Sequence, residues 1–250
     1  MSGNSTDGID QDKFAIQIDN AVKEHRDGQD IVSALNDVSL DVPVGEMVAV
    51  TGKSGSGKST LLNIVGGLEP LTAGSVSVAG QSLVGLNRAE LARLRRRTVG
   101  FVFQNLNLVP SLTAEENVAL PLEFDGVKPK VASELARAAL ETIRISELAK
   151  RFPSELSGGE KQRVAIARAI VGERKIILAD EPTAALDDLT SRIVMGLLAK
   201  LSTDGLTVVI ATHDSEFAAY ADRVVRLKDG SIEHVSDRPR VPASPAELLR

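Results

Sequence analysis

The sequence predicts an α/β domain whose core is a mostly parallel β-sheet, with a helical insertion in the middle of the chain. Up to Phe103, short β-branched runs follow one another closely. Residues of about 105–165 carry helical periodicity instead, and the later part repeats strand and then helix. Because strands that alternate with helices form βαβ units, we expect parallel strands there. The insertion therefore interrupts one domain and does not form a second.

The domain is predicted to span residues 13–235, with the helical subdomain inserted at about 105–165. Residues 1–12 are rich in Ser, Gly, Asn and Asp, so we expect a disordered N-terminal tail. Residues 236–250 contain three prolines and are expected to form a C-terminal tail.

Each element is predicted from its local pattern. Short apolar, β-branched runs predict strands at Phe14–Ile18, Leu35–Val42, Met47–Thr51, Gly74–Val78, Val99–Phe103, Ile176–Ala179, Val208–Ala211 and Val224–Lys228. Stretches with helical spacing predict helices at Lys58–Gly66, Arg88–Arg96, Ala114–Ala119, Lys130–Ile143, Gly158–Val171, Asp188–Asp204 and Ser215–Ala221. The basic run Arg88–Arg97 contains Glu90, so we interpret it as a solvated helix, not as a lipid or nucleic-acid site.

Composition excludes several classes of function. The net charge is -5, which gives no electrostatic basis for binding nucleic acid. The chain has no Cys, which excludes disulfides and thiolate metal sites and fits a reducing cytoplasm. No stretch approaches the roughly 18–20 apolar residues of a membrane-spanning helix, and the acidic N-terminus is not a secretory signal. Any membrane association must therefore come from a partner.

A phosphate-binding loop follows the strand Met47–Thr51. The pattern G-x-x-x-x-G-K-[ST] covers Gly52 to Ser59, with an apolar helix after it. Glycines let backbone N–H groups converge on phosphate oxygens, and the helix N-terminus adds its positive dipole end. Lys58 is expected to reach the β- and γ-phosphates, and Ser59 to bind Mg²⁺. The nucleotide-contacting residues are predicted to be Gly52, Ser54, Gly55, Ser56, Gly57, Lys58, Ser59 and Thr60.

Two carboxylates end the buried strand Ile176–Ala179. Asp180 and Glu181 stand at the carboxyl end of this strand, where α/β sheets bind ligands. Asp180 is placed to hold Mg²⁺, directly or through water, and Glu181 to act as general base on an attacking water. Alone, this pair would be a weak signal, because acids often end strands. Together with the phosphate loop it indicates nucleotide hydrolysis.

A second exposed helix N-terminus begins at Ser157. Ser157 and Glu160 form a capping-box pattern around Gly158 and Gly159. Glycines are costly at the start of a helix unless something approaches the backbone closely. An ordinary capped helix would give the same pattern, but the segment is also suited to bind a second anion.

In that order and spacing, the three motifs resemble those of ATP-binding-cassette (ABC) ATPases, over about Phe14 to Glu233. Ser157-Gly158-Gly159-Glu160-Lys161-Gln162-Arg163 is similar to the signature sequence of the family. The resemblance implies the P-loop ABC cassette fold, with an antiparallel N-terminal β subdomain and an inserted helical subdomain. It also implies Mg-dependent ATP hydrolysis, and a homodimer in which the signature of one subunit completes the ATP site of the other.

Further positions match the family. Gln104 resembles the Q-loop glutamine, a contact to Mg²⁺ and water that senses the membrane partner. Asp187 belongs to a segment similar to the D-loop, although Ala184 and Ala185 replace the Gly-Asn that is usual in this branch. His213 resembles the histidine that contacts the γ-phosphate. His25 stands where the family usually has an aromatic residue, so the resemblance implies that it stacks on adenine.

The segment from Gly100 to Pro110 narrows the resemblance to the branch that serves lipoprotein release, macrolide efflux and cell division. The implied function is an ATPase subunit that powers a separate integral membrane permease in export, lipoprotein extraction or mechanical transmission. It would lie in the cytoplasm, peripheral on the inner face of the cell membrane and held there only by the permease. Non-transport alternatives remain: a cell-division ATPase with a membrane partner, a soluble ABC ATPase, or a scaffold without turnover. The motifs do not identify the substrate.

Overall fold

The strands of the chain form two sheets, and a computed structural model describes them over residues 13–28 and 30–237. The larger sheet has the order β10-β9-β3-β8-β7-β6. All its neighbours are parallel except β9 and β10. Its strands are β3 (Met47–Thr51), β6 (Val99–Val102), β7 (Ile176–Asp180), β8 (Thr207–Thr212), β9 (Arg223–Lys228) and β10 (Ser231–Asp237). The predicted mostly parallel core is confirmed.

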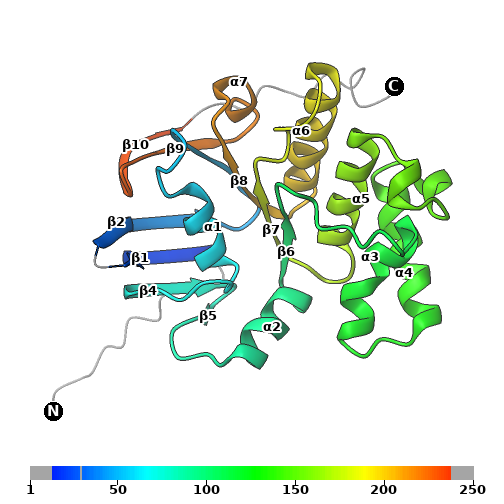
Figure 1. The fold of residues 1–250 in the computed structure, drawn as a ribbon, viewed down its shortest axis with the longest axis horizontal. Helices are drawn as coiled ribbons and strands as arrows, with labels where there is room; N and C mark the ends of the chain where they lie inside the picture. The colour runs from blue at the N-terminus through cyan, green and yellow to red at the C-terminus, as the bar shows by residue number, and fades with distance from the viewer. Residues whose placement is uncertain (1–12, 29, 238–250) are drawn as a thin grey trace, which may run out of the picture.

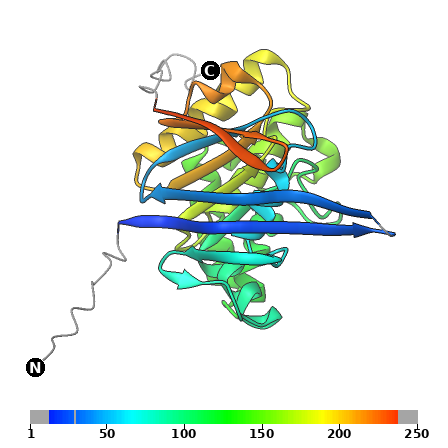
Figure 2. The same cartoon turned by 90° about the vertical axis from the view of Figure 1, so that its left-hand side faces the viewer.

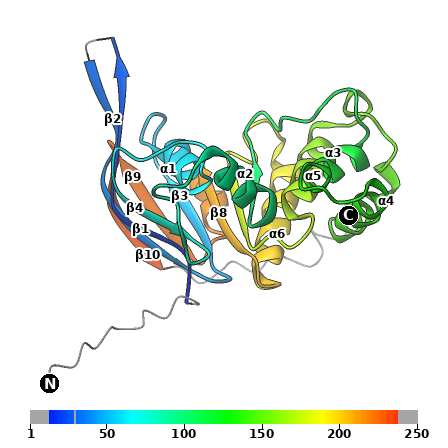
Figure 3. The ribbon, with the colours of Figure 1, turned by 90° about the horizontal axis from the view of Figure 1, so that it is seen from below.

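The smaller sheet is antiparallel and comes mainly from the N-terminal part of the chain, also as predicted. Its order is β2-β1-β4-β5, with β1 (Phe14–Asp27), β2 (Asp30–Pro43), β4 (Ala73–Val78) and β5 (Gln81–Ser82). The strands β1 and β2 are much longer than the predicted Phe14–Ile18 and Leu35–Val42, and their far end extends away from the body of the molecule (Figure 3). The prediction was too short because this far end is solvent-exposed and lacks the apolar alternation of a half-buried strand.

The helices divide into two groups (Figure 1). The first packs around the sheets and comprises α1 (Lys58–Val65), α2 (Arg88–Arg97), α6 (Asp188–Thr203) and α7 (Ser215–Ala218). The second lies between β6 and β7 in the chain and comprises α3 (Ala114–Phe124), α4 (Pro129–Thr142) and α5 (Gly158–Ile170), with 3₁₀ turns at Ser146–Leu148 and Pro153–Glu155. This second group forms the expected helical insertion.

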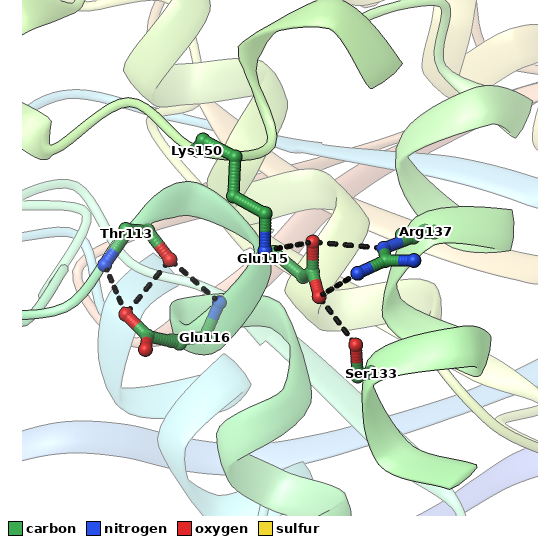
Figure 4. A network of polar contacts seen from close by, with 6 residues as sticks. All are labelled: Thr113, Glu115, Glu116, Ser133, Arg137 and Lys150. Carbon is green, nitrogen blue, oxygen red and sulfur yellow. Dashed lines mark hydrogen bonds and ion pairs between the residues drawn. The ribbon is translucent and has the colours of Figure 1, made fainter. Parts of the chain in front are cut away.

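A buried carboxylate joins two helices of the insertion, α3 and α4 (Figure 4). Glu115 on α3 accepts hydrogen bonds from Ser133 and Arg137 on α4, and its carboxylate lies 3.2 Å from Lys150 Nζ. Its side chain is only 5% exposed, whereas those of Arg137 and Lys150 are 56% and 74% exposed. Burial raises the pKa of Glu115, but the hydrogen bonds from Arg137, Ser133 and Lys150 outweigh it and lower the pKa to about 2. The carboxylate is therefore held in its charged form.

Two hydrophobic clusters lie on opposite sides of the large sheet. In β3, Met47 and Ala49 belong to the cluster that includes α3–α6, while Val48 and Val50 belong to the cluster shared with the antiparallel sheet. Such burial on both faces is typical of a parallel strand in an α/β protein. The view turned by 90° shows the long antiparallel strands crossing one side of the molecule (Figure 2).

The ends of the domain differ slightly from the prediction. Strand β10 includes Ser236 and Asp237, the first two residues of the expected C-terminal tail. The predicted tail residues 1–12 and 238–250 lie outside the described residues. Within residues 13–28 and 30–237, no helix is both long and apolar enough to cross a membrane.

Candidate active site

The loop between β3 and α1 has a backbone that only glycine fits at two positions. Gly52 has φ +154°, and a Cβ there would lie 2.4 Å from the Leu227 carbonyl oxygen. Gly57, which caps α1, has φ +101°, and a Cβ there would lie 2.4 Å from the Ala34 carbonyl oxygen. The loop is therefore tightly wrapped between β2 and β9, with its N–H groups and the start of α1 at one end of the sheet.

Lys58 is the first residue of α1, and its side chain reaches back to this loop. Its side chain is largely buried, and Nζ donates hydrogen bonds to the carbonyl oxygens of Gly52 at 2.8 Å and Lys53 at 3.1 Å. The ammonium is thus held where the loop closes around it, as binding of a phosphate anion requires.

A large cleft of about 1140 Å³ opens over the loop. It brings together most of the residues that the sequence singled out. Those lining it are Gly52, Ser54, Gly55, Gly57, Lys58, Ser59, Thr60, Gln104, Glu181 and His213. Ser56 is buried instead of lining the cleft.

Ser59, which lines the cleft, and Asp180, which is not among its described lining residues, form a pair of oxygen donors. Ser59 Oγ donates a hydrogen bond of 3.0 Å to Asp180 Oδ1. Burial raises the pKa of Asp180, the hydrogen bond from Ser59 opposes this, and the neighbouring charge of Glu181 adds to it. A hydroxyl and a carboxylate oxygen are the donors that Mg²⁺ prefers, so these residues fit that ion. The described residues contain no group of three or more His, Asp or Glu side chains that could hold a metal by themselves.

Glu181 and His213 come from neighbouring strand ends. In the parallel ladder, Asp180 pairs with Ala211, and the N–H of Glu181 donates to the Ala211 carbonyl oxygen at 2.9 Å. Glu181 has φ +46°, an uncommon backbone conformation for a residue other than glycine. Its carboxylate lies 2.9–3.0 Å from His213 Nδ1. Glu181 is 14% exposed and His213 is 66% exposed, so the pair reaches from the floor of the cleft to solvent.

The structure keeps the second predicted anion site apart from the first. Ser157 caps α5 through the predicted capping box with Glu160. Asp187 caps α6 by accepting from Thr190 N at 2.9 Å. A Cβ at Gly159 would lie 2.3 Å from Thr190 Cγ2, so the starts of α5 and α6 pack together. Ser157, Gly158, Gly159 and Asp187 are not among the described residues that line the cleft.

His25 also lies outside the lining of the cleft. It pairs across the antiparallel ladder with Val32, which does line the cleft. Its Nε2 is 3.8 Å from Glu69 Oε2, and the side chain is 47% exposed. His25 is thus beside the cleft and faces the loop that follows α1.

Sequence reasoning missed part of the cleft wall. Val32, Arg226 and His234 line it, from β2, β9 and β10. Arg226 pairs with Thr51 in the β3–β9 ladder, which puts it next to the start of the phosphate loop. A predicted strand at Val224–Lys228 contained Arg226, but only the parallel pairing of β9 with β3 brings it to this edge.

Comparison with known sequences relates the chain to one family. The family model described as ABC transporter matches residues 35–184. The chain is 44% identical over 225 residues to the uncharacterized ABC transporter ATP-binding protein YknY of Bacillus subtilis (strain 168), which covers 90% of this chain and 98% of YknY. It is 45% identical over 205 residues to the macrolide export ATP-binding/permease protein MacB of Escherichia coli (strain K12), covering 82% of this chain and 32% of MacB.

Solved structures agree with the sequence relatives. The dimeric structure of MJ0796, a bacterial ABC transporter cassette, matches with a TM-score of 0.83 at 43% identity, over 90% of this chain and 99% of that chain. MJ0796 is from Methanocaldococcus jannaschii. A dimeric structure of a post-hydrolysis state of MJ0796 bound to ADP and Pi matches with the same TM-score at 42% identity.

Proposed function

The chain belongs to the ABC transporter family and is an ABC ATPase subunit. From that premise we propose that it powers a separate membrane permease. The proposal rests on which residues line the cleft. The cleft joins the phosphate loop with Lys58 to the Glu181–His213 pair, so that an anion and a water-activating carboxylate share one space.

The proposed ATP site follows the chemistry of the lining residues. Loop N–H groups from Gly52 to Thr60 and the ammonium of Lys58 hold the β- and γ-phosphates. Ser59 and Asp180 hold Mg²⁺, with Gln104 as a further oxygen donor. The ion, when bound, neutralises the charge of the phosphate oxygens.

Glu181 is the proposed general base. Its carboxylate accepts the proton of the water that attacks the γ-phosphate, since it borders the cleft and is largely withdrawn from solvent. His213 holds that carboxylate through Nδ1, and its remaining ring nitrogen is free to face the γ-phosphate. For His25 the proposal is a contact with adenine, supported by its pairing with the cleft residue Val32.

The proposed active form is a homodimer. Ser157, Gly158, Gly159 and Asp187 carry exposed helix N-termini that lie away from the cleft of their own chain. In a head-to-tail dimer they would face the γ-phosphate bound by the partner subunit. The relative MJ0796 has been solved as a dimer.

The permease would be a separate chain. MacB is named as an ATP-binding/permease protein, and this chain corresponds to 32% of it. We therefore place the protein in the cytoplasm, held at the inner face of the membrane by the permease. Macrolides, lipoproteins and cell-division components are all substrates or systems that the branch could serve.

Two measurements test the proposal. The first is phosphate release from Mg-ATP by the purified protein, with Glu181→Gln as the inactive reference. The second uses tagged Glu181→Gln protein and Mg-ATP to retrieve partners from solubilised native membranes, with tagged Lys58→Met protein as control. A multi-spanning permease that co-purifies only with the first supports the proposal. ATP-dependent dimers that retrieve only soluble proteins would point to a non-transport ABC ATPase.

A further inference from the structure

The segment that follows Gln104 has an unusual backbone that needs an external support. Leu106 and Asn107 have φ values of +57° and +50°, two consecutive left-handed residues without a glycine. Such conformations persist only where the surroundings impose them. Local turn hydrogen bonds run from Leu106 N to the Phe103 carbonyl oxygen and from Asn107 N to the Asn105 carbonyl oxygen. The support from outside the segment includes one side chain that reaches both residues: Arg168 donates from Nη1 to the Asn107 carbonyl oxygen at 2.6 Å and from Nη2 to the Leu106 carbonyl oxygen at 2.5 Å.

Arg168 is well placed to act as a fixed support. It lies in the last turn of α5, and burial lowers its pKa. The next residue, Ala169, packs directly on the large sheet. Its carbonyl oxygen lies so close to Gly100 of β6 that a Cβ at Gly100 would be 1.8 Å from it. Arg174 then closes the end of α5, donating to the carbonyl oxygens of Arg168 at 2.7 Å and Val171 at 2.9 Å. The backbone that carries the Arg168 side chain is thus fixed against the core.

The other end of the same helix is the start of the signature segment. Helix α5 runs from Gly158 to Ile170, so Arg168 stands three turns from Ser157 on one rigid element. The loop beyond Asn107 is held by the same helical group, since the buried Asn117 of α3 accepts from Val109 N at 2.7 Å and donates to the Val109 and Leu112 carbonyl oxygens. Between them, Arg168 and Asn117 connect the segment after Gln104 to the insertion.

We propose that Arg168 is a positioning residue that couples Gln104 to the signature segment, so that a displacement of the Gln104 loop on nucleotide binding turns α5 and reorients Ser157–Gly159. This role rests on the proposed ATP site. The planar guanidinium fork presents one Nη group to each carbonyl oxygen in a fixed geometry, whereas a lysine ammonium would have to reach both oxygens from a single point on a flexible stem.

The test compares three variants. Arg168→Met removes the fork and the charge, Arg168→Lys keeps the charge alone, and Arg88→Met removes an arginine from an exposed position on α2. Each is made in the wild type for kinetics and in a Glu181→Gln background for hydrogen–deuterium exchange with and without Mg-ATP.

We expect kcat of Arg168→Met to fall about 10-fold or more, with KM for ATP changed less than about 2-fold, since ground-state binding is retained and the closed geometry is lost. In exchange experiments on the Arg168-containing protein, Mg-ATP slows exchange in residues 104–109 and in 157–163. With Arg168→Met only the first segment responds, and Arg168→Lys is intermediate.

A signature segment that still responds to Mg-ATP in Arg168→Met overturns the proposal, as does an equal loss of kcat in Arg88→Met. If Arg168→Met does not fold, the same two readings are taken on Arg168→Lys, and unchanged values there overturn the proposal. Absence of any ATP response in the Arg168-containing protein rejects the proposed ATP site and the Arg168 role with it. If the Arg168-containing protein responds to Mg-ATP and Arg168→Met loses the response only in residues 157–163, the ATP site is present and the loss is specific to the role of Arg168.

Discussion

His213 Nδ1 lies within hydrogen-bond distance of both carboxylate oxygens of Glu181, at 3.0 Å from Oε1 and 2.9 Å from Oε2. The contact exists because β7 and β8 are parallel neighbours that end together, and because Glu181 turns back from its strand with φ +46°. One side chain therefore orients the other, and the imidazole fixes the position of the proposed general base.

Replacement of Glu181 by Gln tests the role of this carboxylate. The amide keeps the shape of the side chain but does not accept a proton at neutral pH, so ATP hydrolysis should fall about 10²–10⁴-fold while ATP still binds. Phosphate release and equilibrium nucleotide binding measure the two effects. Glu134→Gln, at an exposed position on α4, serves as the control. Hydrolysis at the wild-type rate in Glu181→Gln would falsify the general-base assignment.

Replacement of Lys58 by Met should weaken ATP binding by about 10- to 100-fold. A hydrogen bond to a charged group contributes about 1.5–3 kcal/mol, and roughly 1.4 kcal/mol corresponds to a factor of ten in affinity. Lys53→Met removes a lysine from the exposed rim of the same loop and should have a much smaller effect. Isothermal titration with Mg-ATP measures both affinities, and equal losses in the two variants would contradict a special role for Lys58.

Replacement of His25 tests the proposed base contact. Loss of an aromatic contact of about 0.5–1.5 kcal/mol should weaken ATP binding roughly 2- to 10-fold in His25→Ala. His25→Tyr should bind ATP more tightly than the wild type, because a larger ring stacks better. Glu24→Ala, next to it in β1, is the control. Titrations with ATP and GTP that show no change in His25→Ala would exclude the contact.

Replacement of Glu115 by Gln should destabilise the helical insertion. The variant loses charge-assisted hydrogen bonds from Arg137 and Ser133, with an expected cost of about 2 kcal/mol at pH 7. For a chain of this size that lowers Tm by roughly 4–8 °C. Thermal unfolding followed by circular dichroism measures it, with Glu134→Gln as the control from α4.

The Tm difference between the wild type and Glu115→Gln should depend on pH. The pKa of Glu115 is about 2 in the folded chain against an ordinary value of 4.5. A depressed pKa stabilises the fold fully above the unfolded value and loses its effect as pH falls toward the folded value. The Tm difference between wild type and Glu115→Gln should therefore be constant above about pH 5.5 and shrink between pH 4.5 and 2. A difference that does not change over this range would exclude the carboxylate charge as its cause.

Local pattern is sufficient to predict where a residue lies when its position depends on its neighbours in the chain. The phosphate loop required only a strand, glycines and a helix start, and all three are present around Lys58. Asp180 and Glu181 likewise follow from a buried strand that ends in acids.

Residues whose position depends on tertiary pairing could not be predicted in this way. Arg168 is one of several arginines with helical spacing, and nothing nearby in sequence indicates that it meets Leu106, some 60 residues away. The basic run of α2 was interpreted as solvated, yet Arg96 and Arg97 both bind Asp125 at the end of α3. Val32 lines the cleft because the β1–β2 hairpin continues where its side chains are exposed, the apolar Ile31 and Val32 included.

Alternate residues of β3 pack into different hydrophobic clusters, and this affects how the protein unfolds. Met47 and Ala49 face one hydrophobic cluster while Val48 and Val50 face the other, and the phosphate loop begins directly after them. Neither cluster can melt without releasing one face of this strand, so the two halves are expected to open as a single cooperative unit. A nucleotide held by the loop should then slow proteolytic cleavage in the antiparallel sheet and in the helical insertion to the same extent, although the described lining of the cleft includes residues of β2 and none of α3, α4 or α5.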